Sequence, residues 1–371
     1  KLTTDELTIT AWVKPNGIQN DFTGIVMNDG ESTGLNFSSN NQLGFHYHDV
    51  GSTAWAWNSG LFLEEDEWNY VALISDKDGV TLYVNQELAR RDVLLNSTTL
   101  GTMKIGSYKG WGDRNFNGEI DEVAIWDRAL TEEEIRNTRH LTKTIDDFSG
   151  LYAYYQFNES EGVVLDRVGT KHSVIRGSAE RTRSDAPVGG GKSSTVFGLL
   201  AAEGFVGADL DISFFAASEK VTVSKLDAIP DDINIATALI DSVYWILNSD
   251  DLSTTDTLNF TIDKLLDPFY INNPEEIALF ARNENQGPGA FVKVANANSV
   301  QVDDKSYLSF KYPTMDNLQF ILAYENVIST SKEQELLTNV LNHSAASKIQ
   351  VELQVKMLNQ TKTEFEQNIK K

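Results

Sequence analysis

The stretch NFNGEIDEVAIW, from Asn115 to Trp126, decides how the chain is interpreted. It reads as an apolar β-strand that carries two acids, Glu119 and Asp121, two positions apart. Side chains two apart in a strand point to the same face of a sheet. Such a pair suits a sugar-cleaving enzyme, whose retaining form needs two carboxyls about 5 Å apart, and it equally suits a non-catalytic binding module. The two alternatives predict different chemistry.

Catalysis at this strand would need a third acid. Retaining glycosidases of the laminarinase type resemble the pattern Glu-x-Asp-x-x-Glu or Glu-x-Asp-x-Glu, in which the last residue is the general acid. Val123 and Ala124 occupy the two candidate positions for that acid. Glu122 directly follows Asp121, so a regular strand would point it to the opposite face. We therefore predict that the chain is not an enzyme and that Asp121 has a structural or metal-binding role.

The composition excludes several classes of function. The chain has 371 residues, with 54 acidic and 31 basic residues and a net charge of −23. Such a charge repels nucleic acids, so we exclude nucleic acid as a partner. The absence of cysteine excludes disulfides, thiolate nucleophiles and cysteine-bound metals. No run of 18 or more apolar residues occurs, which predicts no membrane span.

The pattern of residues predicts an all-β chain of three parts. Period-two alternation with turn residues dominates residues 1–188, which we expect to form a jelly-roll domain. A helix near residues 131–141 interrupts the strands, with Thr131 and Glu134 as a capping box and Leu130 and Ile135 as a hydrophobic staple. The glycine-rich segment 186–195 reads as a linker. We expect residues 189–326 to form a second β-sandwich. Residues 327–371 form a small C-terminal segment in the sequence, and their alternation of apolar and polar residues favours strands over a helix.

Aromatic and polar residues in the first part are candidates for sugar binding. Trp111 lies between two glycines, where burial of its ring is difficult, and Asp113 follows it closely. An exposed indole stacks on the C–H face of a pyranose, while neighbouring carboxylates and amides bind its hydroxyls. Trp57 and His48 complete the predicted carbohydrate-binding set. Trp55 shares a face with Trp57, and for this pair the alternative is that one of the rings packs between the sheets.

The same region has a candidate calcium site. Asp113, Asn115, Asn117 and Asp121 follow the spacing of oxygen ligands in an EF-hand loop, but Ala124 stands where the bidentate glutamate belongs. This excludes a standard EF-hand and leaves two alternatives: a looser oxygen site, or a polar hairpin loop that turns at Asn117-Gly118. Hard oxygen ligands without cysteine favour Ca²⁺ over transition metals.

Three stretches together carry a family resemblance. They are LTITAWVKP (7–15), EWNYVALISDKDGVTLYVNQELA (67–89) and KIGSYKGWGDRNFNGEIDEVAIWDRALTEEEI (104–135). They resemble the laminin-G-like, concanavalin A-like jelly-roll module of secreted bacterial proteins, and the resemblance extends over residues 1–188. It implies that Glu119 and Asp121 belong to a non-catalytic module. It also implies a calcium site at the rim of a sheet, with Asp121 and Asp166 as ligands.

The tail resembles a second family. The stretch SKIQVELQVKMLNQTKTEFEQNIKK (347–371) is similar to part of the C-terminal sorting domain of type IX secretion cargo. This resemblance implies a secreted or outer-surface protein whose tail contacts secretion or surface-attachment machinery. We therefore expect a non-catalytic extracellular module that binds a glycan or cell-surface polysaccharide, with Ca²⁺ as candidate cofactor. The alternatives are a structural spacer and an accessory domain of a larger polysaccharide-degrading enzyme.

Overall fold

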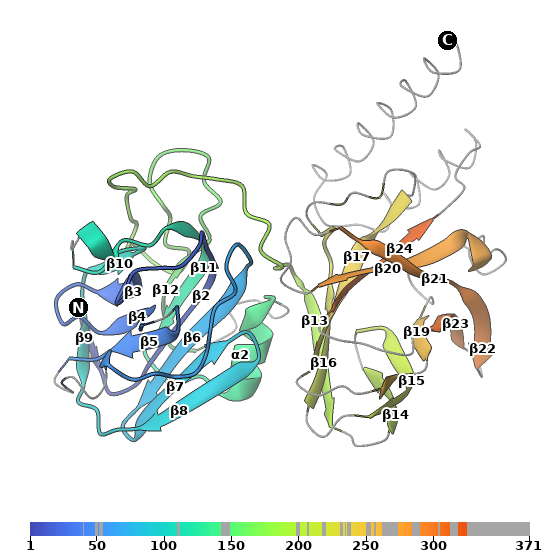
Figure 1. The fold of residues 1–371 in the computed structure, drawn as a ribbon, viewed down its shortest axis with the longest axis horizontal. Coiled ribbons are helices and arrows are strands. Elements are labelled where there is room, and N and C mark those ends of the chain that lie inside the picture. Colours follow the sequence, from blue (N-terminus) through green and yellow to red (C-terminus); the bar gives the residue numbers. More distant parts are fainter. Residues whose placement is uncertain are drawn as a thin grey trace, which may run out of the picture. The chain divides into compact units, whose positions relative to one another are not determined.

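The computed structural model divides the chain into two compact units, the first over Lys1–Val188 and the second beginning at Gly189 (Figure 1). Both units are built from β-strands, which confirms the predicted all-β class. The structure describes residues 1–324 except 40, 49–50, 52–54, 110–111, 142–148, 198–200, 206–207, 217–219, 231–232, 234, 236–238, 250–253, 256, 262–273, 284–289, 303–304 and 312–317. Trp111 and the predicted segment 327–371 therefore lie outside the described residues.

The first unit consists mainly of two antiparallel sheets. The larger sheet contains, in spatial order, β12 (Leu151–Tyr155), β11 (Gly118–Trp126), β2 (Leu7–Pro15), β6 (Asn69–Asp76), β7 (Gly79–Val84) and β8 (Glu87–Asp92). The smaller sheet contains β10 (Met103–Ile105), β3 (Gly24–Asn28), β4 (Gly34–Phe37) and β5 (Leu43–His46). A short pair joins β1 (Leu2–Thr4) to β9 (Thr98–Leu100).

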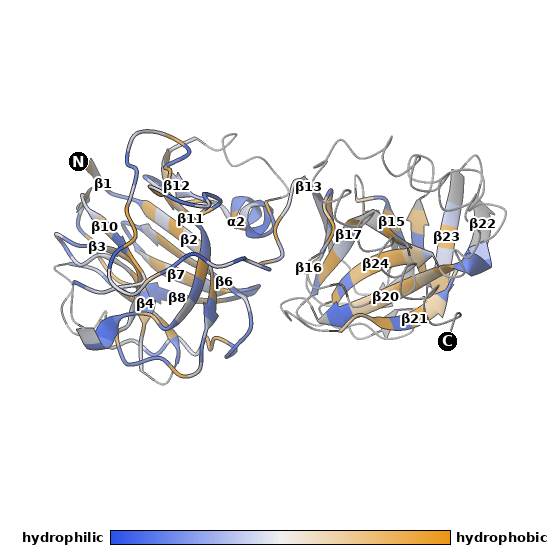
Figure 2. Ribbon diagram, turned by 90° about the horizontal axis from the view of Figure 1, so that it is seen from above, coloured by the Kyte–Doolittle hydropathy of each residue, from blue (hydrophilic) through white to orange (hydrophobic). Residues whose placement is uncertain are grey.

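Alternating side chains explain how these two sheets pack. Leu7 and Ile9 of β2 share one fully buried cluster with Leu35 and Phe37 of β4, so the inner faces of both sheets form one core. In Figure 2 the strands of the larger sheet carry many apolar residues, whereas several of the surrounding loops are hydrophilic.

A helix covers part of the outer face of the larger sheet. Helix α2 (Glu132–Arg139) has Thr131 as its N-cap, and the predicted capping box with Glu134 is present. Ile135 is buried in a second apolar cluster together with Trp12 of β2 and Trp126 of β11. The 3₁₀ turn η1 (Gly112–Arg114) precedes β11. No helix among the described residues is long and apolar enough to cross a membrane.

The second unit also contains two antiparallel sheets. One contains β13 (Gly191–Phe197), β16 (Lys220–Leu226), β17 (Leu239–Ser249), β24 (Leu318–Tyr324), β20 (Ile277–Asn283) and β21 (Val292–Asn296). The other contains β14 (Ala201–Phe205), β15 (Leu210–Ala216), β19 (Thr257–Thr261), β23 (Lys305–Lys311) and β22 (Asn298–Val302), with β18 (Thr254–Thr255) paired to β15. The 3₁₀ turn η3 (Pro274–Glu276) precedes β20.

The second unit has an apolar core of its own. Trp245 of β17 lies 4.7 Å from Phe260 of β19, measured between ring centroids, and Phe260 lies 5.6 Å from Phe310 of β23. All three rings belong to one buried cluster that draws on both sheets of the unit. The unit is therefore a β-sandwich whose core consists of its own residues.

The connection between the units is shorter than the glycine-rich segment suggests. Ala186 is buried in the first unit, and Gly191 already opens strand β13. A Cβ on Gly191 would lie 2.0 Å from the Lys225 carbonyl oxygen, so close strand pairing explains this glycine. The predicted linker 186–195 is thus largely structured, and only the residues between Ala186 and Gly191 remain outside the strands.

Candidate functional site

Two of the three acids of β11, Asp121 and Glu122, lie at a β-bulge, whereas Glu119 pairs in regular register with Lys14. The pairing of β11 with β2 shifts register between Asp121 and Ala124, and Glu122 has a φ of +50°. Asp121 lies opposite Trp12, which belongs to the outer-face cluster, and Glu122 accepts a hydrogen bond from the hydroxyl of Tyr154, which belongs to the same cluster. Both carboxyls therefore face the outer side of the sheet. The prediction that Glu122 points to the opposite face is wrong, because a bulge breaks the strict alternation of side chains.

Both carboxyls are buried and engaged by the protein. Asp121 and Glu122 are 6% and 8% exposed. Burial raises the pKa of Asp121 to about 6, although hydrogen bonds from Ser184 and from the Glu122 N–H oppose the shift. Burial and the neighbouring charge of Asp121 raise the pKa of Glu122 to about 8. The two groups thus act as internal hydrogen-bond acceptors of the bulge.

Asp166 is also occupied by backbone groups. Its side chain is buried, and Oδ1 accepts hydrogen bonds from the N–H groups of Tyr154 and Val168, each 3.1 Å long. Oδ2 accepts a bond of the same length from the Lys171 N–H. Asp166 therefore fastens the turn that follows it to the edge strand β12.

The structure does not gather the predicted calcium ligands into one group. Asp113 is exposed, and the Asn115 carboxamide bonds to the Ser107 hydroxyl and the Gly112 carbonyl. The Asn117 Nδ2 donates to the Asn16 carbonyl. Within the described part of the chain, no three or more His, Asp or Glu side chains are placed to hold a metal ion. These contacts fit the polar hairpin alternative, and calcium binding stays a prediction.

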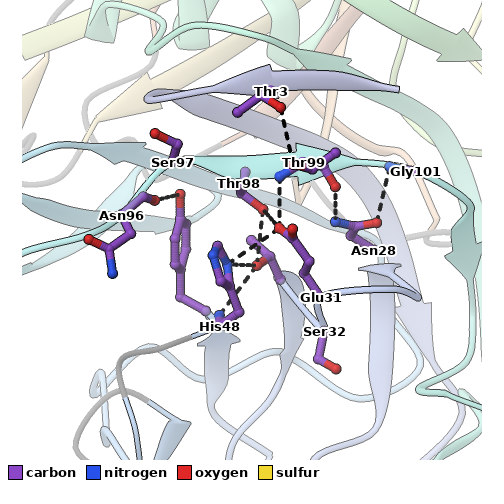
Figure 3. Close-up of polar contacts among 12 residues, drawn as sticks. Thr3, Asn28, Glu31, Ser32, His48, Asn96, Ser97, Thr98, Thr99 and Gly101 are labelled. Carbon is purple, nitrogen blue, oxygen red and sulfur yellow. Dashed lines mark hydrogen bonds and ion pairs between the residues drawn. The ribbon is translucent and has the colours of Figure 1, made fainter.

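His48 belongs to a polar network at the end of the smaller sheet (Figure 3). Its Nδ1 lies 3.1 Å from the Thr33 hydroxyl and 3.6 Å from Glu31 Oε2. The same Glu31 oxygen accepts hydrogen bonds of 2.7 Å from the Thr98 hydroxyl and the Thr99 N–H. Burial raises the pKa of the Glu31 carboxyl, but these hydrogen bonds outweigh it, so the pKa is lowered. The network ties β9 to the β3–β4 loop.

Trp57 is placed at the margin of the inter-sheet core. Its ring is half-buried and meets Phe45 edge-on at 6.0 Å between centroids. The guanidinium of Arg91 lies over it at 5.8 Å. This environment favours the alternative in which Trp57 packs between the sheets.

An aromatic cluster lies beside Asp113, and Trp55 is the one member of it that the sequence singles out. The Arg114 guanidinium is 5.1 Å from the centre of the Tyr108 ring and 5.3 Å from that of Phe22. Phe22 in turn meets Trp55 edge-on at 5.5 Å. Phe22 and Trp55 are both half-buried, whereas Tyr108 is buried. We call Phe22, Trp55, Tyr108 and Arg114 the aromatic–arginine cluster.

The polar neighbours of this cluster extend it toward the smaller sheet. The Asn20 carboxamide donates to the Asp113 carbonyl at 2.8 Å, which fixes the η1 turn next to Arg114. His46 meets the Tyr108 ring edge-on at 6.0 Å. Burial lowers the pKa of His46, and the positive charges of Lys109 and Arg114 lower it further. The surface thus combines half-exposed rings, a cation and neutral hydrogen-bonding groups.

One family model matches part of the first unit. Residues 1–136 match the family model of the concanavalin A-like lectin/glucanase superfamily. The matched residues contain both sheets of the first unit except β12. A search of curated proteins found no match.

Several solved structures are similar to the chain. A putative carbohydrate binding protein from Bacteroides ovatus is 22% identical with a TM-score of 0.39, and the match covers 45% of this chain and 51% of that one. This chain therefore spans about half the length of that protein. Domain 4 of AbnA, a GH43 extracellular arabinanase from Geobacillus stearothermophilus, solved with arabinotriose, is 20% identical with a TM-score of 0.30, covering 37% and 68%. An SAP-like pentraxin from Limulus polyphemus is 16% identical with a TM-score of 0.28, covering 36% and 69%.

Proposed function

We propose that the chain is a non-catalytic glycan-binding module that acts outside the cell or at its surface. The observation that carries the proposal is the aromatic–arginine cluster: partly exposed rings of Phe22 and Trp55 lie beside the Arg114 guanidinium and the exposed Asp113. Ring faces pack against the C–H groups of a pyranose, and charged or amide groups bind its hydroxyls. The concanavalin A-like match of residues 1–136 supports this class of function.

The acids of β11 favour binding over hydrolysis. A retaining glycosidase needs one carboxylate as nucleophile and one acid aimed at the same sugar. Here Asp121 and Glu122 are buried and bonded to Ser184 and Tyr154. Val123 and Ala124 leave no further acid on the following positions. We expect no release of reducing sugar from β-glucans, agars or carrageenans, and turnover that disappears in an Asp121→Asn variant would contradict this.

A panel of neutral polysaccharides tests the proposal. Affinity electrophoresis through gels containing arabinan, xylan or β-glucan should retard the wild-type chain on at least one of them. Trp55→Ala and Arg114→Gln should each weaken that binding several-fold, as expected for loss of one ring or one charged contact. Trp111→Ala should do the same without lowering the melting temperature. Phe62→Ala is the matched control, because this ring is 56% exposed and lies outside the cluster.

Retention on none of the neutral polysaccharides, with the variants equal to wild type, would contradict binding through this cluster. Calcium dependence and surface attachment are measured separately. Calcium dependence is measured by repeating the electrophoresis in chelator. Surface attachment through residues 327–371 is measured by fractionating cells that express the chain with and without that segment.

A further inference from the structure

A basic segment interrupts the acidic first unit. Residues 163–183 contain five arginine or lysine residues and two acidic residues, whereas the rest of the unit contains 12 basic and 27 acidic residues. One of the two acids, Asp166, is buried and occupied by backbone N–H groups. Glu180 is the one exposed acid of the segment. Arg167 forms an ion pair with Glu159 just outside the segment, so the cations in excess are Lys171, Arg176, Arg181 and Arg183.

Apolar side chains are exposed along the same segment. Val163, Val168, Val174 and Ile175 are 45%, 42%, 51% and 36% exposed. Such residues gathered on one stretch mark an interaction surface more often than isolated ones do.

The backbone places two of these valines opposite each other. Val164 and Ser173 exchange both of their backbone hydrogen bonds, at 2.9 and 2.8 Å, as an isolated antiparallel bridge. Val164 points into the core and is buried. Val163 and Val174 are the next pair along this bridge, and their side chains therefore point away from the core on the same face.

Cations flank this valine pair. Arg181 is partly buried, and its Nη2 donates to the carbonyl of Gly162 at 2.9 Å, which holds the guanidinium next to Val163. Arg176 follows Val174 by two residues and is exposed. Lys171 is exposed, and its Nζ reaches the Tyr152 carbonyl at 2.8 Å. An apolar platform with guanidinium groups beside it fits a ligand that has both apolar faces and anionic groups.

We propose that the segment 163–183 binds an anionic polysaccharide, with the valine pair against sugar rings and Arg176 and Arg181 against their carboxylates. The choice of a glycan rests on the proposed function, whereas the choice of an anion rests on the charge of the segment. At physiological salt the screening length is about 8 Å, so a chain lying along the segment interacts mainly with these local cations. Elsewhere on the unit a polyanion would come within this distance of acidic side chains, which disfavours binding there.

Polygalacturonate is the probe, and its fully methyl-esterified form is the matched neutral ligand. In affinity electrophoresis the wild-type chain should be retarded by the acid form and not by the ester, and 0.5 M salt should abolish the retardation. The double variant Arg176→Gln/Arg181→Gln should bind about tenfold more weakly. Arg176→Lys/Arg181→Lys retains the charge and should keep most of the affinity, which controls for a folding defect. Val163→Ser/Val174→Ser should weaken binding several-fold.

A charge-matched control separates this site from a general charge effect. Lys1→Gln/Lys77→Gln removes two exposed cations elsewhere and should leave binding unchanged. An equal loss in this control, or no loss in the arginine double variant, would overturn the proposal. Equal retardation by poly-glutamate would also overturn it in favour of an acidic peptide ligand. Binding to neutral polysaccharides without binding to polygalacturonate would reject this inference alone, since that result leaves the aromatic–arginine cluster as the binding surface.

Discussion

The raised pKa of Glu122 makes the folded protein less stable as the pH rises. Its pKa in the folded protein is raised to about 8, and that of Asp121 to about 6, above the ordinary values of 4.5 and 3.8. The folded state therefore holds protons that the unfolded chain has released. This contribution to stability is complete below about pH 4 and is lost as the pH rises through 6 and 8.

We predict that the free energy of unfolding falls as the pH rises from 5 to 8, by at most about 1.4 kcal/mol per pH unit for each proton involved. Glu122→Gln removes one of these ionisations while keeping an acceptor for Tyr154, so the fall should become shallower. Urea unfolding at pH 5, 6.5 and 8 in chelator measures it. Glu133→Gln, at an exposed position of α2, is the control and should follow the wild-type curve. Identical slopes for wild type and Glu122→Gln would contradict the buried, protonated state.

Asp166 should also contribute to stability through its hydrogen bonds to the backbone. Its carboxylate accepts three backbone N–H groups, and Asp166→Ala would leave these donors without their partner. We expect a loss of about 1 to 2 kcal/mol, because the Tyr154 N–H would stay buried without an acceptor while the other two donors are only part-buried. Asp113→Ala should cost almost nothing, since that side chain is exposed. Unfolding is measured in chelator, in calcium and in magnesium. A specific stabilisation by calcium that Asp166→Ala removes would support the predicted metal site, and equal effects of both cations would reject it.

Short sequence patterns predict helices and strands better than they predict the sheet face to which each side chain points. The capping box of α2 depends on residues three positions apart, and both Thr131 and Glu134 take their predicted roles. The strand character of residues 118–126 was likewise readable from its apolar pattern. The bulge at Glu122 could not be predicted, because no sequence pattern indicates that a glutamate takes a positive φ.

Contacts between distant segments also escaped sequence reasoning. Trp68 donates to Asp185, and Lys14 lies 3.6 Å from the same carboxylate, so the segment near residue 185 packs beside β2 and β6. Phe22 and Trp55 come from separate loops and meet near Arg114 only through the fold. The candidate glycan surface could therefore be identified only in the structure, whereas the sequence alone indicates Asp113 beside it.

Helix α2 supports a prediction for a single element. Thr131→Ala removes the hydroxyl that accepts the Glu134 N–H at 3.2 Å, and it leaves intact the reciprocal bond from the Thr131 N–H to the Glu134 carboxylate. Loss of an N-cap costs about 1 kcal/mol. The free energy of unfolding should fall by that amount, as measured in urea. Thr170→Ala, a matched change at an exposed position outside any helix, should have little effect, and an equal loss in both variants would contradict a capping role.

At the scale of the whole molecule, separate cores predict separate folding. The core of the first unit lies between its own two sheets, and the ring cluster around Trp245 and Phe260 lies within the second unit. The connection runs from the buried Ala186 to Gly191, where β13 begins. Few residues therefore link the two cores, which is typical of a domain boundary.

We predict that the fragment 1–188 folds alone, melts cooperatively and keeps both glycan-binding activities of the whole chain. All residues of the aromatic–arginine cluster and of the segment 163–183 belong to the first unit. The fragment 189–326 should fold without binding either polysaccharide, so the second unit would serve as a spacer or as the site for a different partner. Calorimetry of the whole chain should show two transitions that match those of the fragments. A single transition for the whole chain, together with an unfolded 1–188 fragment, would mean that the two cores depend on each other.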